Sequence, residues 1–279
     1  MSDLKEAYVK TGNFSTHYWE QGEGHPVIMI HGGGAGADGY GNFKKNLPIF
    51  ANAGFRAIAY DIVGFGKSDK PDPKEFDYTY EARAKQLIDF IDALDLEPVT
   101  LIGNSMGGGT SLVATLKSPE KVKRLILMGS AGHRRPQTQE EIQKSNARNA
   151  LYNFKQTKDG MRNLISGLTN DAFELDEDYL DYRFEITQLP GTMEAYRATM
   201  KNLTELGLYL EKEQLEAIKQ NTLFVHGKKD KMVPISHSYE MFEHIENSRL
   251  YAISNCGHWA MLEYPEEFSK VCIDFINEF

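Results

Sequence analysis

The clearest pattern along the chain is a series of short, continuous apolar runs in its first half. These runs cover residues 27–30, 56–60, 99–102 and 122–128, without a regular alternation of polar and apolar side chains. Such runs are typical of strands that are buried on both faces of a parallel sheet. Residues 80–96, between two of the runs, place their apolar side chains on one stripe of a helix. This order of strand, helix and strand predicts an α/β fold with a mostly parallel central sheet flanked by helices.

The same pattern returns near the C-terminus. Residues 222–225 and 249–253 have the composition of further strands, and residues 235–244 and 265–279 have that of helices. Pro265 suits the first turn of the last helix. Because these elements continue the α/β pattern, we expect them to extend the sheet that the first half begins.

The stretch between the two halves differs in composition. No valine occurs between Val122 and Val225, whereas acidic, amide, tyrosine and methionine residues are abundant, which disfavours strands and suits helices. We therefore predict a helical lid inserted at residues 133–210, and a core formed by residues 1–132 and 211–279. The lid is expected to break at Gly160, around Asn170 and at Pro190 and Gly191. The alternative is a helical stretch within one continuous α/β domain.

Length and charge exclude several classes of partner. A chain of 279 residues favours one large domain, with or without an insertion. Its 31 Lys and Arg against 40 Asp and Glu give a formal net charge of −9, and it has no basic block. Such a chain offers no electrostatic footprint for a nucleic acid or an anionic membrane, so neither is expected as a partner.

The cysteines and the apolar runs bear on the compartment. Cys256 and Cys272, the only two cysteines, support neither a disulfide framework nor a paired zinc signature, and we expect inert thiols. The first ten residues lack a signal-peptide pattern, and no apolar run approaches the roughly 20 residues that span a bilayer. These observations favour a cytoplasmic protein without a metal site.

Two glycine motifs resemble nucleotide-binding loops. Residues 34–39 satisfy G-x-G-x-x-G after an expected strand, but residues 39–42 are a poor start for the helix that would face a pyrophosphate. Residues 66–68 resemble the end of a P-loop, yet Asp61 stands where that pattern needs its first glycine. We therefore predict no nucleotide cofactor.

A third motif, Gly103-Asn104-Ser105-Met106-Gly107, lies in the sequence context that is typical of a serine nucleophile. It follows the expected strand 99–102 and precedes a helix that continues through residue 117, which is the strand-turn-helix setting of G-x-S-x-G. The turn strains the serine backbone, and the glycines remove Cβ atoms that would collide with strand and helix. Ser105 is therefore the expected nucleophile. The alternative is a glycine-rich turn with an incidental serine.

A serine nucleophile needs a base, and the base needs an acid that orients it. In this fold class the chain order is serine, acid, histidine. Asp230 follows the expected strand 222–225, and His258 follows the expected strand 249–253. Asp230 has the alternative of capping a turn. Asp61 and His31 also follow strands, but the chain order favours Asp230 as acid and His258 as base, with His31 bracing its glycine loop.

Acyl transfer also needs donors aimed at the developing oxyanion. One is expected from the backbone N–H of Met106, the residue after the nucleophile, and the second from a glycine loop after an earlier strand. Residues 31–34, His-Gly-Gly-Gly, form such a loop, and we favour Gly33 as the donor. This interpretation also explains the dinucleotide-like motif.

These motifs resemble the α/β-hydrolase superfamily and, within it, the meta-cleavage product hydrolases, which cleave carbon-carbon bonds in aromatic degradation. The lid is similar to the carbazole and biphenyl branch through LTNDAF at 168–173. The resemblance covers nearly the whole chain and rests on Arg183 and on these segments: HGGGAGADGYGNF at 31–43, GFGKSD at 64–69, GNSMGG at 103–108, LMGSAG at 127–132 and CGHWAMLE at 256–263.

The resemblance implies a cofactor-free hydrolase of 2-hydroxy-6-oxohexa-2,4-dienoates, which are small anionic substrates. Their C5–C6 bond would be cleaved to 2-hydroxypenta-2,4-dienoate and a carboxylic acid. Arg183 matches the family's carboxylate-binding arginine, and its planar fork suits bidentate capture. Asn42, Asn104 and Trp259 match the family's other polar and aromatic positions in the site.

Each of these positions has a simpler alternative. Arg183 could form a surface ion pair with Asp178 or Asp181, Asn42 could be a turn residue, and Trp259 could pack against the lid. Two other functions also stay open: a carboxylesterase that uses the same triad, and a small-molecule receptor that has kept the fold without efficient turnover. We also expect a homo-oligomer, a dimer or larger.

Overall fold

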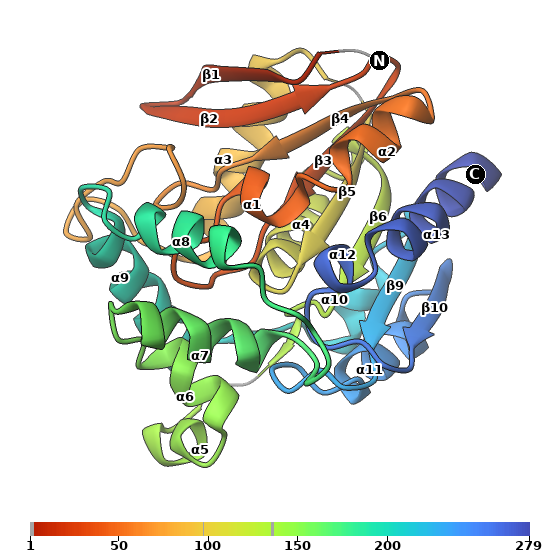
Figure 1. Cartoon of the computed structure of the whole chain (residues 1–279). Helices are drawn as coiled ribbons and strands as arrows, with labels where there is room; N and C mark the ends of the chain where they lie inside the picture. Colours follow the sequence, from red (N-terminus) through yellow and green to blue (C-terminus); the bar gives the residue numbers. More distant parts are fainter. Residues whose placement is uncertain (1–2, 97, 135–136) are drawn as a thin grey trace.

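The computed structural model describes residues 3–96, 98–134 and 137–279 (Figure 1). Its main feature is an eight-stranded sheet in the order β1-β2-β4-β3-β5-β6-β9-β10. The strands have these bounds: β1 Lys5–Thr11, β2 Phe14–Gln21, β3 His25–Ile30, β4 Phe55–Tyr60, β5 Val99–Asn104, β6 Val122–Met128, β9 Asn221–Gly227 and β10 Ser248–Ile253. The pairs β1–β2 and β2–β4 are antiparallel and the other pairs are parallel. The predicted α/β fold with a mostly parallel sheet is therefore confirmed.

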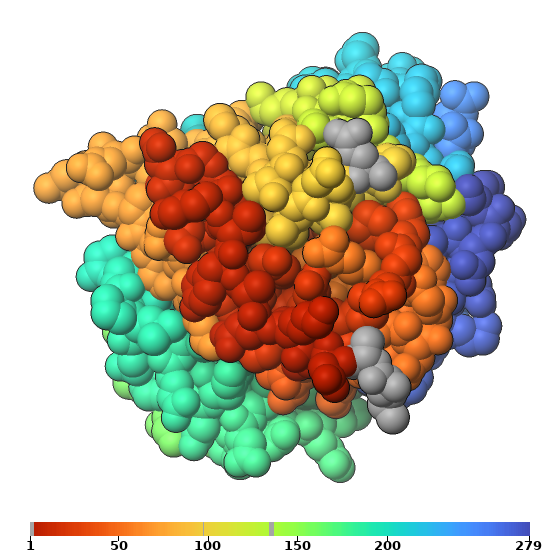
Figure 2. Space-filling model, turned by 90° about the horizontal axis from the view of Figure 1, so that it is seen from above, coloured from red at the N-terminus to blue at the C-terminus, as the bar shows by residue number. Residues whose placement is uncertain are grey.

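The six parallel strands lie where the apolar runs predict them, but the hairpin β1–β2 is an addition. Residues of β1 are mostly exposed or half-buried, because this strand is an edge of the sheet. Figure 2 shows the hairpin spread over one face of the molecule. An exposed edge hairpin carries polar side chains and lacks the continuous apolar run on which the prediction depended.

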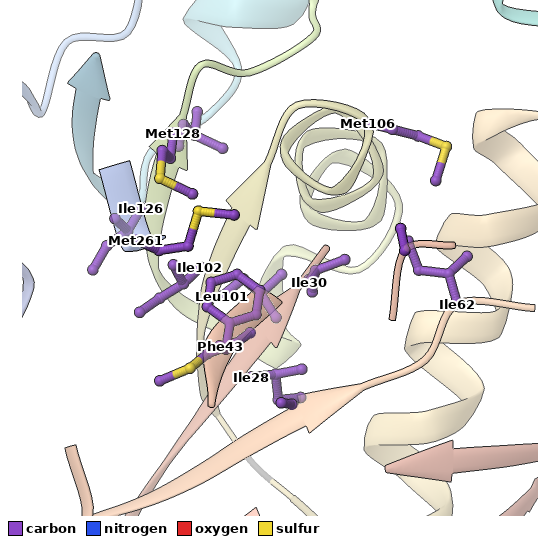
Figure 3. Close-up of a cluster of buried hydrophobic side chains, with 14 of the residues drawn as sticks. Ile28, Ile30, Phe43, Ile62, Leu101, Ile102, Met106, Ile126, Met128 and Met261 are labelled. Atoms are coloured by element: carbon purple, nitrogen blue, oxygen red, sulfur yellow. The ribbon is translucent and has the colours of Figure 1, made fainter. Parts of the chain in front are cut away.

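Helices cover both faces of the sheet, with α2 and α13 in front of it and α3 and α4 behind it in Figure 1. Apolar side chains from neighbouring strands meet between these layers (Figure 3). The cluster includes Ile28, Ile30, Leu101, Ile102, Ile126 and Met128 from the strands, with Phe43 and Met261 from short helices. The core helices have these bounds: α1 Gly39–Phe43, α2 Leu47–Asn52, α3 Tyr80–Ala93, α4 Met106–Lys117, the 3₁₀ helix η1 Pro119–Lys121, α10 Lys212–Glu216, α11 Ser236–His244, α12 Ala260–Glu263 and α13 Pro265–Glu278.

The short helix α1 corrects one expectation. Residues 39–42 were expected to be a poor start for a helix, yet α1 begins at Gly39. The reason is the preceding residue, Asp38, whose side chain accepts a hydrogen bond from the N–H of Gly41 at 2.9 Å and so caps the helix. The helix has only five residues, and it places Asn42 on the side of the sheet where the parallel strands end.

Residues 133–210 contain five helices that lie together, away from the N-terminal hairpin (Figure 1). These are α5 Gln139–Gln143, α6 Asn146–Tyr152, α7 Lys158–Leu168, α8 Glu177–Ile186 and α9 Thr192–Glu205. The expected breaks at Asn170 and at Pro190 and Gly191 fall between helices, but Gly160 lies inside the first turn of α7. That prediction is wrong because Thr157 caps α7 through the N–H of Gly160 at 3.0 Å.

The composition of residues 133–210 disfavours strands, but the structure has a short strand at each end of this stretch. β7 (His133–Arg134) and β8 (Leu208–Tyr209) pair antiparallel, with His133 opposite Tyr209. The two ends of this stretch therefore lie side by side. No helix in the described part of the chain is long and apolar enough to cross a bilayer.

Candidate active site

Ser105 stands in a strained turn between β5 and α4. Its φ is +54° and its ψ is −114°, a backbone conformation that a residue with a Cβ rarely adopts. The turn is held by hydrogen bonds on both sides: the N–H of Ser105 donates to the carbonyl of Met128 at 3.0 Å, and its own carbonyl accepts from Ala131 at 2.9 Å. The serine is thus fixed at the end of the strand, half-buried beside the neighbouring loop.

The glycines on either side of Ser105 allow this close packing. A Cβ on Gly103 would lie 2.6 Å from the carbonyl carbon of Gly107. A Cβ on Gly107 would lie 2.6 Å from the carbonyl oxygen of His31 and closer still to that of Ile30. Both obstacles are backbone atoms, so the structure has no side chain that could move aside.

We expect Gly107→Ala to destabilise the fold. The added methyl group would force α4 away from β3, and overpacking of this kind costs about 1–3 kcal/mol in the free energy of unfolding. Urea unfolding followed by circular dichroism measures the loss. Gly33→Ala is the matched control, since its Cβ would meet the flexible Met106 side chain at 3.1 Å. Equal midpoints for Gly107→Ala and the unsubstituted protein would contradict this account.

Asp230 and His258 lie on the loops after β9 and β10 and are hydrogen-bonded. His258 Nδ1 donates to Asp230 Oδ2 at 2.6 Å, and both side chains are almost fully buried. The other carboxylate oxygen accepts from the N–H groups of Met232 at 2.7 Å and Val233 at 2.9 Å. Burial alone raises the pKa of Asp230, but the charge of His258 and hydrogen bonds from His226 and His258 outweigh it and hold the pKa well below its usual range. Asp230 is thus an ionised, fixed partner for the imidazole.

The alternative acid and base, Asp61 and His31, are fully engaged elsewhere. His31 Nδ1 donates to the carbonyl of Gly32 at 2.7 Å, and its Nε2 accepts from the N–H of Ile62 at 3.1 Å, as expected for a brace of the glycine loop. Burial lowers the pKa of His31 to about 4, so it is neutral at pH 7. Asp61 accepts from the N–H of Gly39 at 2.7 Å and is paired with His17 at 2.8 Å.

The glycine loop after β3 passes directly beside the serine turn. A Cβ on Gly32 would lie 2.9 Å from Asn104 Oδ1 and 3.3 Å from the Cβ of Ser105. A Cβ on Gly33 would lie 3.1 Å from Met106 Sδ. The structure therefore brings Gly33 and Met106 close together next to Ser105, and both line the same cavity.

Arg183, on α8, is buried without an acidic partner. Its Nη1 donates to Asn42 Oδ1 and to the hydroxyl of Tyr179, both at 3.3 Å. The guanidinium carbon lies 4.7 Å from the centroid of the Trp259 ring. Its Nε and Nη2 have no hydrogen-bond partner, and among the described residues no carboxylate lies within 4 Å of it. A buried cation in this state is costly unless a ligand completes it.

The alternative of a surface ion pair for Arg183 is wrong. Arg183 is 1% exposed. Asp181 is instead paired with Lys158 at 2.6 Å. Because α8 turns Arg183 inward, its side chain is directed to the glycine loop, where a Cβ on Gly34 would lie 2.9 Å from Nη2.

Ser105, His258 and Arg183 line one cavity together with Gly33 and Met106, whereas Asp230 lies behind His258 and does not line it. The cavity encloses about 680 Å³ not occupied by atoms. Its polar wall contains Ser105, His258 and Arg183, together with Asn42 and Asn104, whose side chains each carry one buried atom without a hydrogen-bond partner. Trp259 closes this wall. The remaining wall is largely apolar and includes Ala131, Leu151, Leu168, Met200, Leu203, Leu208, Met232 and Val233. No group of three or more His, Cys, Asp or Glu in the described residues is arranged to hold a metal.

The sequence did not indicate the role of Glu263 in holding the His258 loop. Its carboxylate accepts from the N–H groups of Gly257 at 3.0 Å and Trp259 at 3.3 Å, and from both the backbone and the side chain of Asn170. The N–H of His258 itself donates to the carbonyl of Leu168 at 2.9 Å. The loop of the proposed base is thus joined to the turn after α7. The only sequence feature that pointed to this role was the position of Glu263 at the end of the CGHWAMLE segment.

Comparisons with known proteins agree with this geometry. A family model described as "alpha/beta hydrolase fold" matches residues 25–265. The chain is 40% identical over 274 residues to the 2-hydroxy-6-oxo-6-(2'-aminophenyl)hexa-2,4-dienoic acid hydrolase of Metapseudomonas resinovorans, covering 98% of this chain and 91% of the relative. It is 35% identical to the 2-hydroxy-6-oxo-6-phenylhexa-2,4-dienoate hydrolase of Comamonas testosteroni, over 95% of this chain and 92% of the relative.

A solved structure shows the same similarity in three dimensions. It is a serine hydrolase involved in carbazole degradation, with a TM-score of 0.88 and 39% sequence identity. The superposition covers 99% of this chain and 100% of that chain. The sheet, the helices and the inserted helices therefore have counterparts throughout the length of both proteins.

Proposed function

The chain belongs to the meta-cleavage product hydrolases of the α/β-hydrolase fold family, and from this premise we propose which bond it cleaves. The substrate is a 2-hydroxy-6-oxohexa-2,4-dienoate. Hydrolysis of its C5–C6 bond yields 2-hydroxypenta-2,4-dienoate and a carboxylic acid. The acyl group attached to C6 occupies the apolar part of the cavity, next to Leu203 and Val233.

The observation that carries this proposal is that Nε and Nη2 of Arg183 have no hydrogen-bond partner and that this residue lines the same cavity as Ser105. A substrate carboxylate would complete its hydrogen bonding in a bidentate manner and neutralise a buried charge. The open Nδ2 of Asn42 lies on the same wall and offers a further donor. A simple ester has no group that needs this cation.

The chemistry requires a change of tautomer before the carbon-carbon bond breaks. Proton loss from the 2-hydroxyl group and protonation at C5 give a 2-oxo acid with a saturated C5, and His258 assists these transfers. When C5–C6 breaks, the electron pair is delocalised from C5 to the 2-oxo oxygen. The product is therefore a stabilised dienolate, and no free carbanion forms.

His258 also acts as the general base of Ser105, and Asp230 fixes its orientation. Ser105 attacks C6, and the N–H groups of Gly33 and Met106 bind the resulting oxyanion. A donor of this kind contributes roughly 3–4 kcal/mol to transition-state stabilisation. Departure of the dienolate leaves an acyl-enzyme, which water hydrolyses to the carboxylic acid.

A substrate comparison tests the proposal. Mixed with a yellow dienol acid, the purified protein should remove the visible absorbance and release the dienoate and the carboxylic acid in equal amounts. Its kcat/KM should exceed that for a nitrophenyl ester by at least about 30-fold, the effect of a charge-assisted contact of roughly 2 kcal/mol. A preference for the ester would instead support the carboxylesterase. If the protein turns over neither substrate and a serine-reactive phosphonate does not label it, the result would support the small-molecule receptor.

We also propose a domain organisation, a compartment and an oligomeric state for the protein. Residues 133–210 act as the lid over a core formed by residues 1–132 and 211–279, a division supported by the pairing of β7 with β8. The protein works in the cytoplasm as a homo-oligomer. Both of its cysteines are buried free thiols, which suits a reducing compartment.

A further inference from the structure

Asp38 is a buried carboxyl group that lies just outside the cavity. The proposed reaction gives it no role. One oxygen caps α1 through the N–H of Gly41 at 2.9 Å. The other oxygen accepts a hydrogen bond from the hydroxyl of Tyr182, on α8. The Asp38 side chain therefore joins the core to the lid through Tyr182, which is 144 residues further along the chain.

This link runs beside the contact that forms the carboxylate subsite. Tyr182 directly precedes Arg183 on α8, and Asn42 lies on the helix that Asp38 caps. The two hydrogen bonds, Tyr182 to Asp38 and Arg183 to Asn42, thus connect the same two helices. Loss of the first would leave the second, which is long at 3.3 Å, and the ring contact of Tyr182 with Tyr40 to align α8 with α1.

The backbone around the link is closely packed. A Cβ on Gly41 would lie 2.9 Å from the Tyr182 ring. A Cβ on Gly36 would lie 3.2 Å from Cγ of Arg183 and even closer to its carbonyl oxygen. Only glycines at these two positions let α8 approach the loop this closely. Because α8 packs directly on the loop, a small shift of the helix would move the guanidinium of Arg183.

The charges around Asp38 suit a place next to an anionic ligand. Burial, together with the charge of Asp61, raises the pKa of Asp38 to about 7, against the lowering effects of Tyr182 and Arg183. Burial likewise raises the pKa of Tyr182, which stays a donor, and Tyr179 is the remaining titratable group on α8 that faces this carboxyl. At neutral pH Asp38 is partly protonated and repels a substrate carboxylate less than a fully ionised aspartate would.

We propose that Asp38 and Tyr182 are positioning residues whose hydrogen bond fixes α8 against α1, so that Arg183 and Asn42 converge on the carboxylate of the substrate. This inference rests on the proposed function. It assigns the pair to recognition of the carboxylate and gives it no part in bond cleavage.

Tyr182→Phe tests the inference, because it removes the hydroxyl and keeps the ring. We expect KM for the dienol acid to rise about fivefold to tenfold, the effect of losing one hydrogen bond worth about 1 kcal/mol, with kcat changed less than twofold. The kcat/KM for a nitrophenyl ester should stay unchanged, since that substrate has no carboxylate. Tyr251→Phe is the matched control: it removes a hydrogen bond from an exposed tyrosine to Glu267 at 2.8 Å, far from α8.

Asp38→Asn and the double variant show whether the two groups act together. Asp38→Asn should raise the same KM, and adding Tyr182→Phe should raise it less than twofold further, because the shared contact is already lost. An unchanged KM in Tyr182→Phe, equal losses for dienol acid and ester, or fully additive effects would each overturn the inference. Absence of dienol-acid turnover in the unsubstituted protein would overturn the proposed function instead.

Discussion

Ser105→Ala is expected to abolish cleavage of the dienol acid and to leave its binding intact. The side chain supplies the attacking oxygen, and loss of a serine nucleophile lowers kcat by about a million-fold in well-characterised serine hydrolases. Arg183, Asn42 and Trp259 are untouched, so the substrate should still be held. Stopped-flow absorbance gives the rate of cleavage, and the spectrum of the bound dienol acid under excess protein gives the dissociation constant.

The matched control for this variant lies on the helix that Ser105 precedes. Ser111 is also buried, but its hydroxyl donates to the carbonyl of Gly107 at 2.8 Å and does not line the cavity. Ser111→Ala should therefore keep its turnover. A serine-reactive phosphonate should label the unsubstituted protein and Ser111→Ala, and it should not label Ser105→Ala. Turnover by Ser105→Ala within tenfold of the unsubstituted protein would rule out the assignment of the nucleophile.

Arg183→Ala is expected to separate the two candidate substrates. Truncation of a buried charge that pairs with a ligand costs about 2–5 kcal/mol, which corresponds to a fall in kcat/KM for the dienol acid of roughly 30-fold to several thousand-fold. Hydrolysis of a nitrophenyl ester should change less than threefold. The free protein loses no ion pair in this variant, although Asn42 and Tyr179 each lose the hydrogen bond from Nη1.

The control for Arg183 is another lid arginine. Arg162, on α7, is about half exposed and forms an ion pair with Glu177 at 2.6 Å. Arg162→Ala removes the same number of atoms and the same charge, so an effect of net charge alone would appear in both variants. Parallel losses for dienol acid and ester in Arg183→Ala would show a general disturbance of the cavity and contradict the assignment of this residue to the carboxylate.

The parts predicted from sequence are those that local patterns determine. Apolar runs mark the parallel strands because most of these strands are buried on both faces; the edge strand β10, which is largely exposed, is the exception. The Ser105 turn is readable because its steric demands fall on Gly103 and Gly107, two residues away on either side. His258 and Asp230 could be chosen because each follows one of the marked strands.

The parts that were missed depend on contacts between distant segments. Nothing in the local sequence shows that Tyr182 meets Asp38, or that Glu263 holds Asn170, because the partners are 144 and 93 residues apart in the chain. Gly160 was expected to break a helix on propensity alone, but the cap from Thr157 decides where α7 begins. The inward direction of Arg183 likewise follows from how α8 packs.

The pairing of β7 with β8 has a consequence for how such a protein can change. Since His133 lies opposite Tyr209, the two ends of residues 133–210 meet at one place in the structure. Exchange of residues 133–210, by recombination or by splicing, would keep the order of the strands that carry Ser105, Asp230 and His258, but it would replace Arg183. Inheritance of another segment would therefore change recognition of the carboxylate and part of the apolar wall together, while the nucleophile, acid and base stay in place.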